Sequence, residues 1–239
     1  MDYQYLLSIN VFLVFVIVTF AQPSVNVYPC QYGDYGINFS NTTHLSNFRL
    51  VDNSTVASEQ TFASVCYDEE YLNIQTTNFD DNIYSPFTDC NDDLYKADAF
   101  EVFLAYGSNQ PEFYLEIELS PMGVLFVSKI YNPGDACSTI SGTLIDCGQS
   151  GIIYNATVYD QFNTWVGTLR IPLELIYQTS SSSSSEGSSQ PLTPSTLRFN
   201  MFRIDVPLNS PMQFACWNPT DANPPCFHIP SAFGYMNFQ

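Results

Sequence analysis

The stretch from residue 197 to 238 concentrates side chains that can bind a flat, polar ligand. It contains Arg198-Phe199-Asn200, then Cys216-Trp217-Asn218-Pro219-Thr220, then Phe227-His228-Ile229-Pro230. No helical period fits this spacing, which favours loops on a β framework. Aromatic rings pack against the C–H faces of sugar rings, while arginine and amide groups bind hydroxyls. The segment therefore predicts a surface for an uncharged, hydroxyl-covered ligand such as a sugar.

The elements that must position these residues read as short β-strands. Residues 113–119 alternate, so Phe113, Leu115, Ile117 and Leu119 are expected to face a core, while Glu116 and Glu118 face outward. A Ser-Pro-Met-Gly turn at 120–123 and an apolar run at 124–131 complete a predicted hairpin. Further strands are expected at 48–51, 71–75, 99–104, 152–159, 165–171 and 197–204, with one helical turn at 172–176.

Many short strands separated by Gly, Pro and Asn predict an all-β fold, an antiparallel β-sandwich of the jelly-roll or immunoglobulin-like type. The serine-rich tract at 179–190 is interpreted as a disordered loop inserted within one domain, 22–239. Only about 50 residues follow it, which is short for an independent core.

The first 21 residues have the pattern of a signal peptide. Residues 6–21 are largely apolar, and Thr19 and Ala21 place small side chains before a cleavage site. The segment is short for a permanent bilayer anchor, which needs about 20 apolar residues. The mature chain is therefore expected to begin at Gln22 and to be secreted, with no membrane span.

Glycosylation sequons and cysteines support an extracellular location. Sequons begin at Asn38, Asn41, Asn53 and Asn155. The seven cysteines predict disulfides rather than a zinc site, because no CxxC pair occurs. The sequence leaves the disulfide connectivity open. Cys137 and Cys147 flank a Ser/Thr/Gly-rich segment and Cys216 and Cys226 flank a Pro-rich loop, so each pair could form a disulfide. Cys66 with Cys90 is a weaker prediction, and Cys30 would then be free or joined to another chain.

The charge balance restricts the partners. The chain has 24 acidic and 6 basic residues, a net charge of −18. Such a surface repels nucleic acid, anionic lipid and acidic polysaccharide, so neutral glycans and cations remain.

Three segments together resemble carbohydrate-binding module family 9, within the wider set of DOMON-type β-sandwiches. They are the Tyr95-x-x-Asp98-Ala99-x-Glu101-x-Phe103 strand, the Tyr114-to-Gly123 hairpin, and the C-terminal set described above. The resemblance covers residues 71–238. It implies a sugar-binding β-sandwich, a frequent association with glycoside hydrolases, and structural calcium in some members.

The resemblance also implies roles for individual residues. A sugar would lie between two rings, supplied here by Tyr95 and Trp217, with Glu101 binding its hydroxyls. Asn218 and Arg203 are candidate donors. Structural hydrogen bonding is the alternative for Arg203, since Asp205 shares its strand face, and core packing is the alternative for both aromatic residues.

Calcium is expected, if bound, at acidic loops. Calcium takes six to eight oxygen ligands with loose geometry, and Asp80, Asp81, Asp92 and Asp98 are the candidates. The alternative is that these aspartates are solvated or serve in turns.

The preferred function is a non-catalytic carbohydrate-binding protein. A glycoside hydrolase or an accessory module in carbohydrate catabolism is the first alternative, although no catalytic carboxylate pair stands out. A haem-binding DOMON-type domain is the second, with Met122, Met212 and His228 as axial candidates. A nucleophilic triad is not indicated, because the histidines are only His44 and His228 and no GxSxG motif occurs.

Overall fold

The computed structural model describes residues 22–34, 36–179 and 194–239. The predicted signal peptide and all but the first residue of the predicted serine-rich loop lie outside this part of the chain. Within it, no helix is long and apolar enough to cross a membrane.

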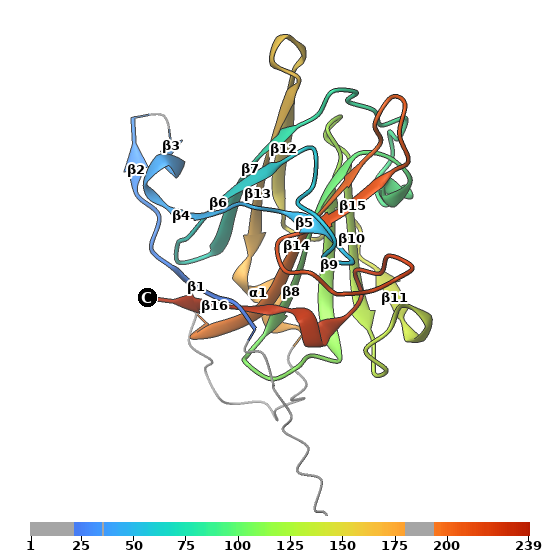
Figure 1. Ribbon diagram of the computed structural model, residues 1–239. Coiled ribbons are helices and arrows are strands. Elements are labelled where there is room, and N and C mark those ends of the chain that lie inside the picture. Colours follow the sequence, from blue (N-terminus) through green and yellow to red (C-terminus); the bar gives the residue numbers. More distant parts are fainter. Residues whose placement is uncertain (1–21, 35, 180–193) are drawn as a thin grey trace, which may run out of the picture.

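Two β-sheets pack face to face (Figure 1). The large sheet has the strand order β1-β16-β14-β8-β9-β10-β11, with β15 paired to β14 and β5 paired to β15. Its strands are β1 (Ser24–Val27), β5 (Arg49–Leu50), β8 (Ala99–Tyr106), β9 (Phe113–Leu119), β10 (Leu125–Tyr131), β11 (Ser141–Leu144), β14 (Thr196–Asp205), β15 (Gln213–Cys216) and β16 (Gly234–Phe238).

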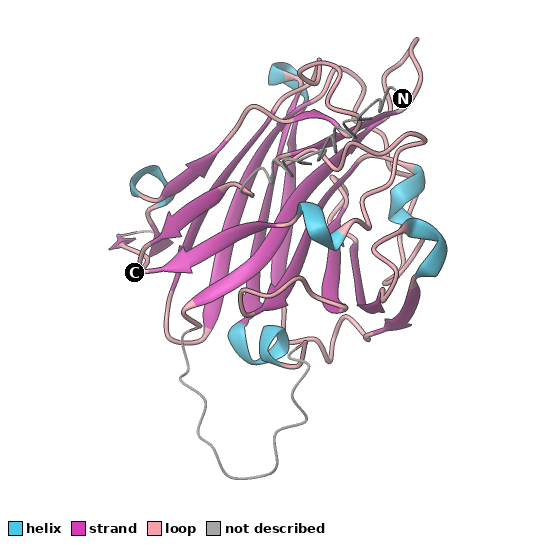
Figure 2. Cartoon of the chain, turned by 60° about the horizontal axis from the view of Figure 1, so that its bottom comes forward, coloured by secondary structure: helices cyan, strands magenta, loops and turns pink. Residues whose placement is uncertain are grey.

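The small sheet has the order β12-β13-β7-β6-β4. Its strands are β4 (Thr43–Leu45), β6 (Thr61–Tyr67), β7 (Tyr71–Phe79), β12 (Ile153–Tyr159) and β13 (Thr164–Pro172). A separate hairpin pairs β2 (Tyr32–Gly33) with β3 (Gly36–Ile37), and α1 (Leu173–Tyr177) follows β13. Strands dominate the cartoon in Figure 2, where the helices are single short turns.

The prediction of an all-β sandwich is confirmed. The hairpin of β9 and β10 pairs Phe113 with Tyr131 through to Leu119 with Leu125, and α1 is the expected helical turn. The pairing is antiparallel throughout both sheets except between β1 and β16, which run parallel. The sequence patterns missed β6, β15 and β16, and also the short strands β1, β2, β3, β4 and β11.

The main core lies between the two sheets. Val102 and Leu104 of β8 and Ile117 of β9 pack against Trp165 of β13 and Ile74 of β7, all buried. Alternate residues on the same large-sheet strands point to the opposite face of the sheet, because side chains alternate along a strand.

That outer face of the large sheet is buried as well. Phe103, Tyr114 and Phe202 pack there against Phe227 and Phe233, which belong to the segment between β15 and β16. Glu116 and Glu118 do point away from the main core, as expected, but they are buried rather than half-exposed. The alternation of β9 could not reveal this, because the cover comes from a segment about 110 residues away in sequence.

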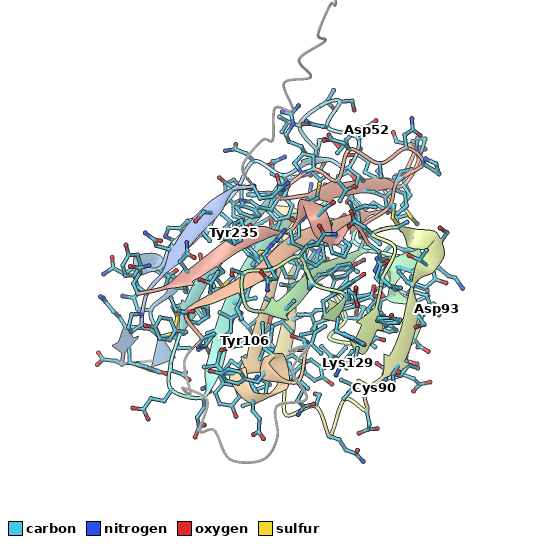
Figure 3. The ribbon with its side chains drawn as sticks, turned by 90° about the horizontal axis from the view of Figure 1, so that it is seen from below. Asp52, Cys90, Asp93, Tyr106, Lys129 and Tyr235 are labelled. Atoms are coloured by element: carbon cyan, nitrogen blue, oxygen red, sulfur yellow. A yellow bond between two sulfur atoms is a disulfide. The ribbon has the colours of Figure 1, made fainter. Side chains whose placement is uncertain are left out.

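The disulfides pair differently from the sequence prediction. The bonds are Cys30–Cys66, Cys90–Cys147 and Cys137–Cys226, and Cys216 is the free, buried thiol. Cys90 is labelled in Figure 3. The predicted Cys137–Cys147 staple is wrong because β11 lies between these residues and pairs with β10. The predicted Cys66–Cys90 pair is wrong because Cys66 bonds to Cys30 and Cys90 bonds to Cys147. The predicted Cys216–Cys226 pair is wrong because Cys226 bonds to Cys137, and the unpaired cysteine is therefore Cys216 and not Cys30.

Candidate functional site

A cavity of about 410 Å³ opens on the outer side of the large sheet. Strands β8, β9 and β10 supply one wall, and the segment after β15 supplies another. The lining residues are Tyr95, Glu101, Glu116, Glu118, Phe126, Cys137, Ile140, Ile204, Phe214, Pro225, Cys226, Phe227 and His228.

Three glutamates meet in this cavity because of strand register. Glu101 of β8 lies opposite Glu118 of β9, and Glu116 is two residues earlier on the same face. Each offers one carboxylate oxygen, and these oxygens lie within 4.8 Å of one another. The residues are only 2 % (Glu101), 8 % (Glu116) and 1 % (Glu118) exposed.

The surroundings of these carboxylates disfavour negative charge. Burial raises the pKa of Glu116 to about 8, and it raises the pKa of Glu101 and Glu118 well above their usual range, with further increases from the neighbouring glutamates. Among the described residues, no lysine or arginine lines the cavity. Glu101 Oε1 and Glu118 Oε2 have no hydrogen-bond partner within the same part of the chain, so the cavity contains unsatisfied acceptors.

His228 approaches the glutamates from the covering segment. Its Nε2 lies 3.4 Å from Glu116 Oε1, and its Nδ1 lies 2.8 Å from the hydroxyl oxygen of Tyr114. The ring packs on Phe103, with centroids 4.9 Å apart. Burial lowers the pKa of His228 to about 4, so the imidazole is neutral at physiological pH.

Aromatic side chains complete the cavity. Tyr95 lies in the short 3-10 helix Leu94–Lys96 and is 50 % exposed. Phe227 stacks on Phe202 at 4.3 Å, with 18° between the rings. The cavity therefore combines an accessible aromatic ring with buried hydrogen-bond acceptors.

The structure brings together only some of the predicted ligand-binding residues. Tyr95 and Glu101 line the same cavity. Trp217 does not; its ring stacks on Phe199 at 4.7 Å and packs against the main core. Asn218 is also elsewhere, where its Nδ2 donates to Ala232 O at 2.6 Å and Gln22 Oε1 at 2.7 Å. Tyr95 and Trp217 thus do not face each other across this cavity.

Sequence reasoning did not assign Glu116, Glu118 or Phe227 as site residues, and it treated His228 as a structural residue, with a haem or metal ligand as the alternative. A signal was present for the glutamates. In a hairpin-connected sheet, Glu116 and Glu118 share a strand face, and an antiparallel neighbour carrying Glu101 brings a third carboxylate to that face.

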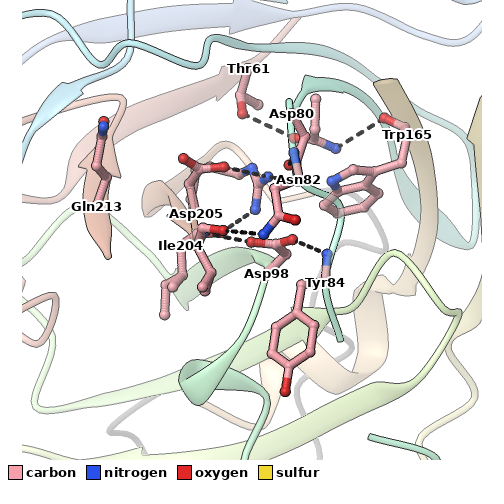
Figure 4. Close-up of polar contacts among 12 residues, drawn as sticks. Thr61, Asp80, Asn82, Tyr84, Asp98, Trp165, Ile204, Asp205 and Gln213 are labelled. Carbon is pink, nitrogen blue, oxygen red and sulfur yellow. Dashed lines mark hydrogen bonds and ion pairs between the residues drawn. The ribbon is translucent and has the colours of Figure 1, made fainter. Parts of the chain in front are cut away.

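Arg203 lies on the opposite side of the large sheet from the cavity. Its Nη2 donates to Asp80 Oδ2 at 2.6 Å and to Asp205 Oδ1 at 3.3 Å, and all three side chains are buried. Figure 4 shows Asp80, Asp98 and Asp205 converging near Trp165 of the small sheet. The cluster therefore connects the two sheets. Arg203 thus makes the structural hydrogen bonds that the sequence analysis gave as the alternative to ligand binding.

The aspartates of this cluster do not fit a calcium ion. Asp80 and Asp98 come together with Asp205, but the Arg203 guanidinium already supplies the positive charge. Both oxygens of Asp98 accept backbone N–H groups, from Tyr84 and Val206. Of the other candidates, Asp81 is exposed and outside the cluster, and Asp92 accepts the N–H groups of Thr88 and Asp89 in a turn. Calcium binding at these four aspartates remains a prediction, and the hydrogen bonds and the ion pair that Asp80, Asp92 and Asp98 already make do not favour it.

The remaining sequence candidates lie on the surface or in other contacts. The four sequon asparagines, Asn38, Asn41, Asn53 and Asn155, are all exposed. Met122 is exposed in the β9–β10 turn, and Met212 packs at the edge of the outer-face aromatic cluster.

Comparison with solved structures identifies the fold. A protein from Bacteroides uniformis ATCC 8492, provisionally assigned as carbohydrate-binding, superposes with a TM-score of 0.68 at 13 % identity, over 92 % of this chain and all of the other. A family 9 carbohydrate-binding module from Caldicellulosiruptor kristjanssonii in complex with glucose gives 0.57 at 12 % identity, over 90 % and 96 % of the two chains. The complex of such a module with cellotriose gives 0.54 at 12 % identity, over 91 % and 94 %.

This chain has the fold of a family 9 carbohydrate-binding module. The sequence comparison is more limited. No protein-family model matches the chain. An "Extracellular protein" of Arthroderma benhamiae is 27 % identical over 122 residues, which span 48 % of this chain and 55 % of that protein.

Arg203→Met tests the structural role of the buried ion cluster. The substitution leaves buried carboxylates without a cation, so we expect a loss of about 3–5 kcal/mol in unfolding free energy. Arg170→Met is the matched control, because Arg170 pairs with Asp68 at 3.4 Å and its side chain is 38 % exposed; its pair should contribute about 1 kcal/mol or less. Urea denaturation measures both, and equal losses would contradict the assignment.

The same cluster predicts a pH dependence of stability. Burial raises the pKa of Asp98 to about 7 and that of Asp205 to about 6, above the usual 3.8. Between the usual and the raised pKa the folded chain holds more protons than the unfolded chain, so this contribution to stability is lost as pH rises from about 4 to about 7.

Asp205→Asn isolates one part of this effect. Relative to the wild type, the variant should gain stability between about pH 4 and pH 6 and then level off. Calorimetric melting temperatures across pH 4–8 provide the measurement. Other groups, including His228, titrate equally in both proteins, so parallel curves for the two proteins would sink this prediction.

Proposed function

We propose that this protein is extracellular and binds a neutral carbohydrate, without chemical conversion, in the cavity lined by Tyr95 and the three glutamates. The observation that carries the proposal is the combination of a half-exposed tyrosine ring with unpartnered buried carboxylate oxygens in one cavity. The shared fold with modules solved in complex with glucose and cellotriose supports it.

The chemistry of the cavity matches that of a sugar. The C–H face of a pyranose packs on the Tyr95 ring, and its hydroxyls donate to carboxylate oxygens, which are acceptors. Donation to Glu101 Oε1 or Glu118 Oε2 would satisfy atoms that the protein itself leaves unpaired. The net charge of −18 disfavours acidic sugars.

Three further observations support an extracellular location. Three disulfides are characteristic of an oxidising compartment. All four sequon asparagines are accessible to glycosylation. The relative from Arthroderma benhamiae is described as extracellular. Sizing the secreted product before and after deglycosylation, and sequencing its N-terminus, tests export, glycosylation and cleavage before Gln22.

Tyr95→Ala tests the binding site. A neutral glycan array that includes cellotriose and glucose identifies the ligand, and calorimetry then compares variants. Loss of the ring should lower affinity about tenfold, because an aromatic contact contributes about 0.5–1.5 kcal/mol beyond area burial. Glu101→Gln should also weaken binding, because it replaces one oxygen that can accept a sugar hydroxyl with an NH₂ group that can only donate.

Tyr159→Ala is the matched control. Tyr159 is 43 % exposed on β12 of the small sheet, on the other layer of the sandwich. Its loss should change affinity less than twofold. Equal effects of the two tyrosine substitutions, or no binding to any neutral glycan, would overturn the assignment.

Glycoside hydrolysis is the second candidate, and one observation favours it. The carboxylate oxygens of Glu101, Glu116 and Glu118 lie within 4.8 Å of one another, and Glu116, with its pKa raised to about 8, holds a proton at neutral pH. Retaining glycosidases place two carboxyl groups about 5–5.5 Å apart. The test is release of reducing sugars from xylan or cellulose. If the wild type releases them and Glu116→Gln does not, the protein is a glycoside hydrolase rather than a non-catalytic binding protein.

The haem alternative has a separate test. His228 faces the cavity, whereas Met122 is exposed on a turn. Purified protein without Soret absorption after incubation with haemin would dispose of this alternative.

A further inference from the structure

The floor of the cavity carries a concentration of metal-binding groups that sugar binding alone does not require. Glu101, Glu116 and Glu118 converge there, and the His228 imidazole of the covering segment lies beside one of them, with Nε2 3.4 Å from Glu116 Oε1. We propose that these four side chains bind a divalent metal ion of the Zn²⁺ or Mn²⁺ type. The proposal concerns the ion alone and stands whether or not a sugar binds.

The distances suit one ion. The donors of a tetrahedral zinc ion, each about 2.1 Å from it, lie about 3.4 Å apart. The three carboxylate oxygens lie within 4.8 Å of one another, so rotation of the glutamate side chains would bring them around one ion. His228 Nε2, 3.4 Å from Glu116 Oε1, is also within the range of a shared ligand sphere.

The unpartnered atoms require a positively charged or proton-donating group. Glu101 and Glu118 are each more than nine-tenths buried, and one oxygen of each lacks a partner. Buried carboxylates without a partner are costly. No lysine or arginine from residues 22–34, 36–179 or 194–239 lines the cavity. The aspartate cluster on the opposite face of the sheet has Arg203 for this purpose, and the glutamates have no equivalent.

The histidine is arranged as a metal ligand. The Tyr114 hydroxyl oxygen lies 2.8 Å from Nδ1, and with Nδ1 held in this way Nε2 faces Glu116. A hydrogen bond on the far ring nitrogen is the usual support for a metal-bound histidine. Asn132 Nδ2 further fixes the residue by donating to His228 O at 3.0 Å.

The donor set decides the class of ion. Three carboxylates and one imidazole suit Zn²⁺ or Mn²⁺, because imidazole is a good ligand for transition metals. Calcium prefers a shell of oxygen ligands, whereas one of the four proposed ligands here is the His228 nitrogen.

Metal titration of the sugar-free, chelator-treated protein tests the proposal. We expect saturable, one-to-one binding of Zn²⁺ or Mn²⁺ by calorimetry, with a melting temperature that rises with free ion concentration. Glu118→Gln and His228→Gln should each lower affinity at least tenfold. Glu118→Gln nearly preserves side-chain shape and removes a buried charge, so the ion-free variant should fold at least as stably as the ion-free wild type.

Two controls keep the outcome unambiguous. Glu174→Gln changes an exposed glutamate on α1 and should leave ion affinity unchanged. Asp205→Asn alters the other acidic cluster and should also leave it unchanged. Absence of binding, binding retained in Glu118→Gln, or binding lost only in Asp205→Asn would each overturn the proposal. Because no sugar is present, failure of carbohydrate binding cannot produce any of these results.

Discussion

The burial of both faces of the large sheet is the constraint on which the rest of this structure depends. One face of β8, β9 and β14 packs against the small sheet, and the other lies beneath the segment that links β15 to β16. An ordinary sandwich sheet has one face in water, so polar residues there need no partner. Here they are enclosed, and this enclosure gives Glu101, Glu116 and Glu118 their unusual protonation behaviour.

The covering segment is held at several points in its second half, between residues 226 and 233. The Arg198 side chain of β14 lies on the outer face of the large sheet and donates to the carbonyl oxygens of Pro230 and Phe233. Asp135, in the loop after β10, accepts the N–H of Ser231 at 2.8 Å, and the Cys137–Cys226 disulfide joins the same loop to the segment. The arginine, carboxylate and disulfide together fix the second wall of the cavity over the first.

Much of the fold could be predicted from the sequence, because residues close together in the chain determine the strands and turns. The alternation at 113–119 and the turn at 120–123 determine the β9–β10 hairpin, and the abundance of short strands determines the class. The resemblance of the Tyr95-to-Phe103 strand also gave the correct fold, and it placed Tyr95 and Glu101 in one cavity.

The rest depended on contacts between distant segments. Trp217 looked like a second sugar platform by its position in an aromatic loop, but its ring stacks on Phe199. The disulfide pairs were misjudged because each true bond joins segments 36 to 89 residues apart. Glu116 and Glu118 carried no sign in their own strand that another part of the chain would bury them. The side of the sheet that Arg203 faces likewise followed only from the register of β14.

The Cys137–Cys226 bond has a consequence for where the cavity can exist. Both sulfur-bearing residues line it, yet neither belongs to the core between the sheets. In a compartment that keeps thiols reduced, the covering wall would lose its covalent tether while the sandwich beneath kept its packing, and such a wall can open locally without global unfolding. Folding of the sandwich and formation of the complete cavity would then be separable, and formation of this disulfide would be the last step in assembling the site.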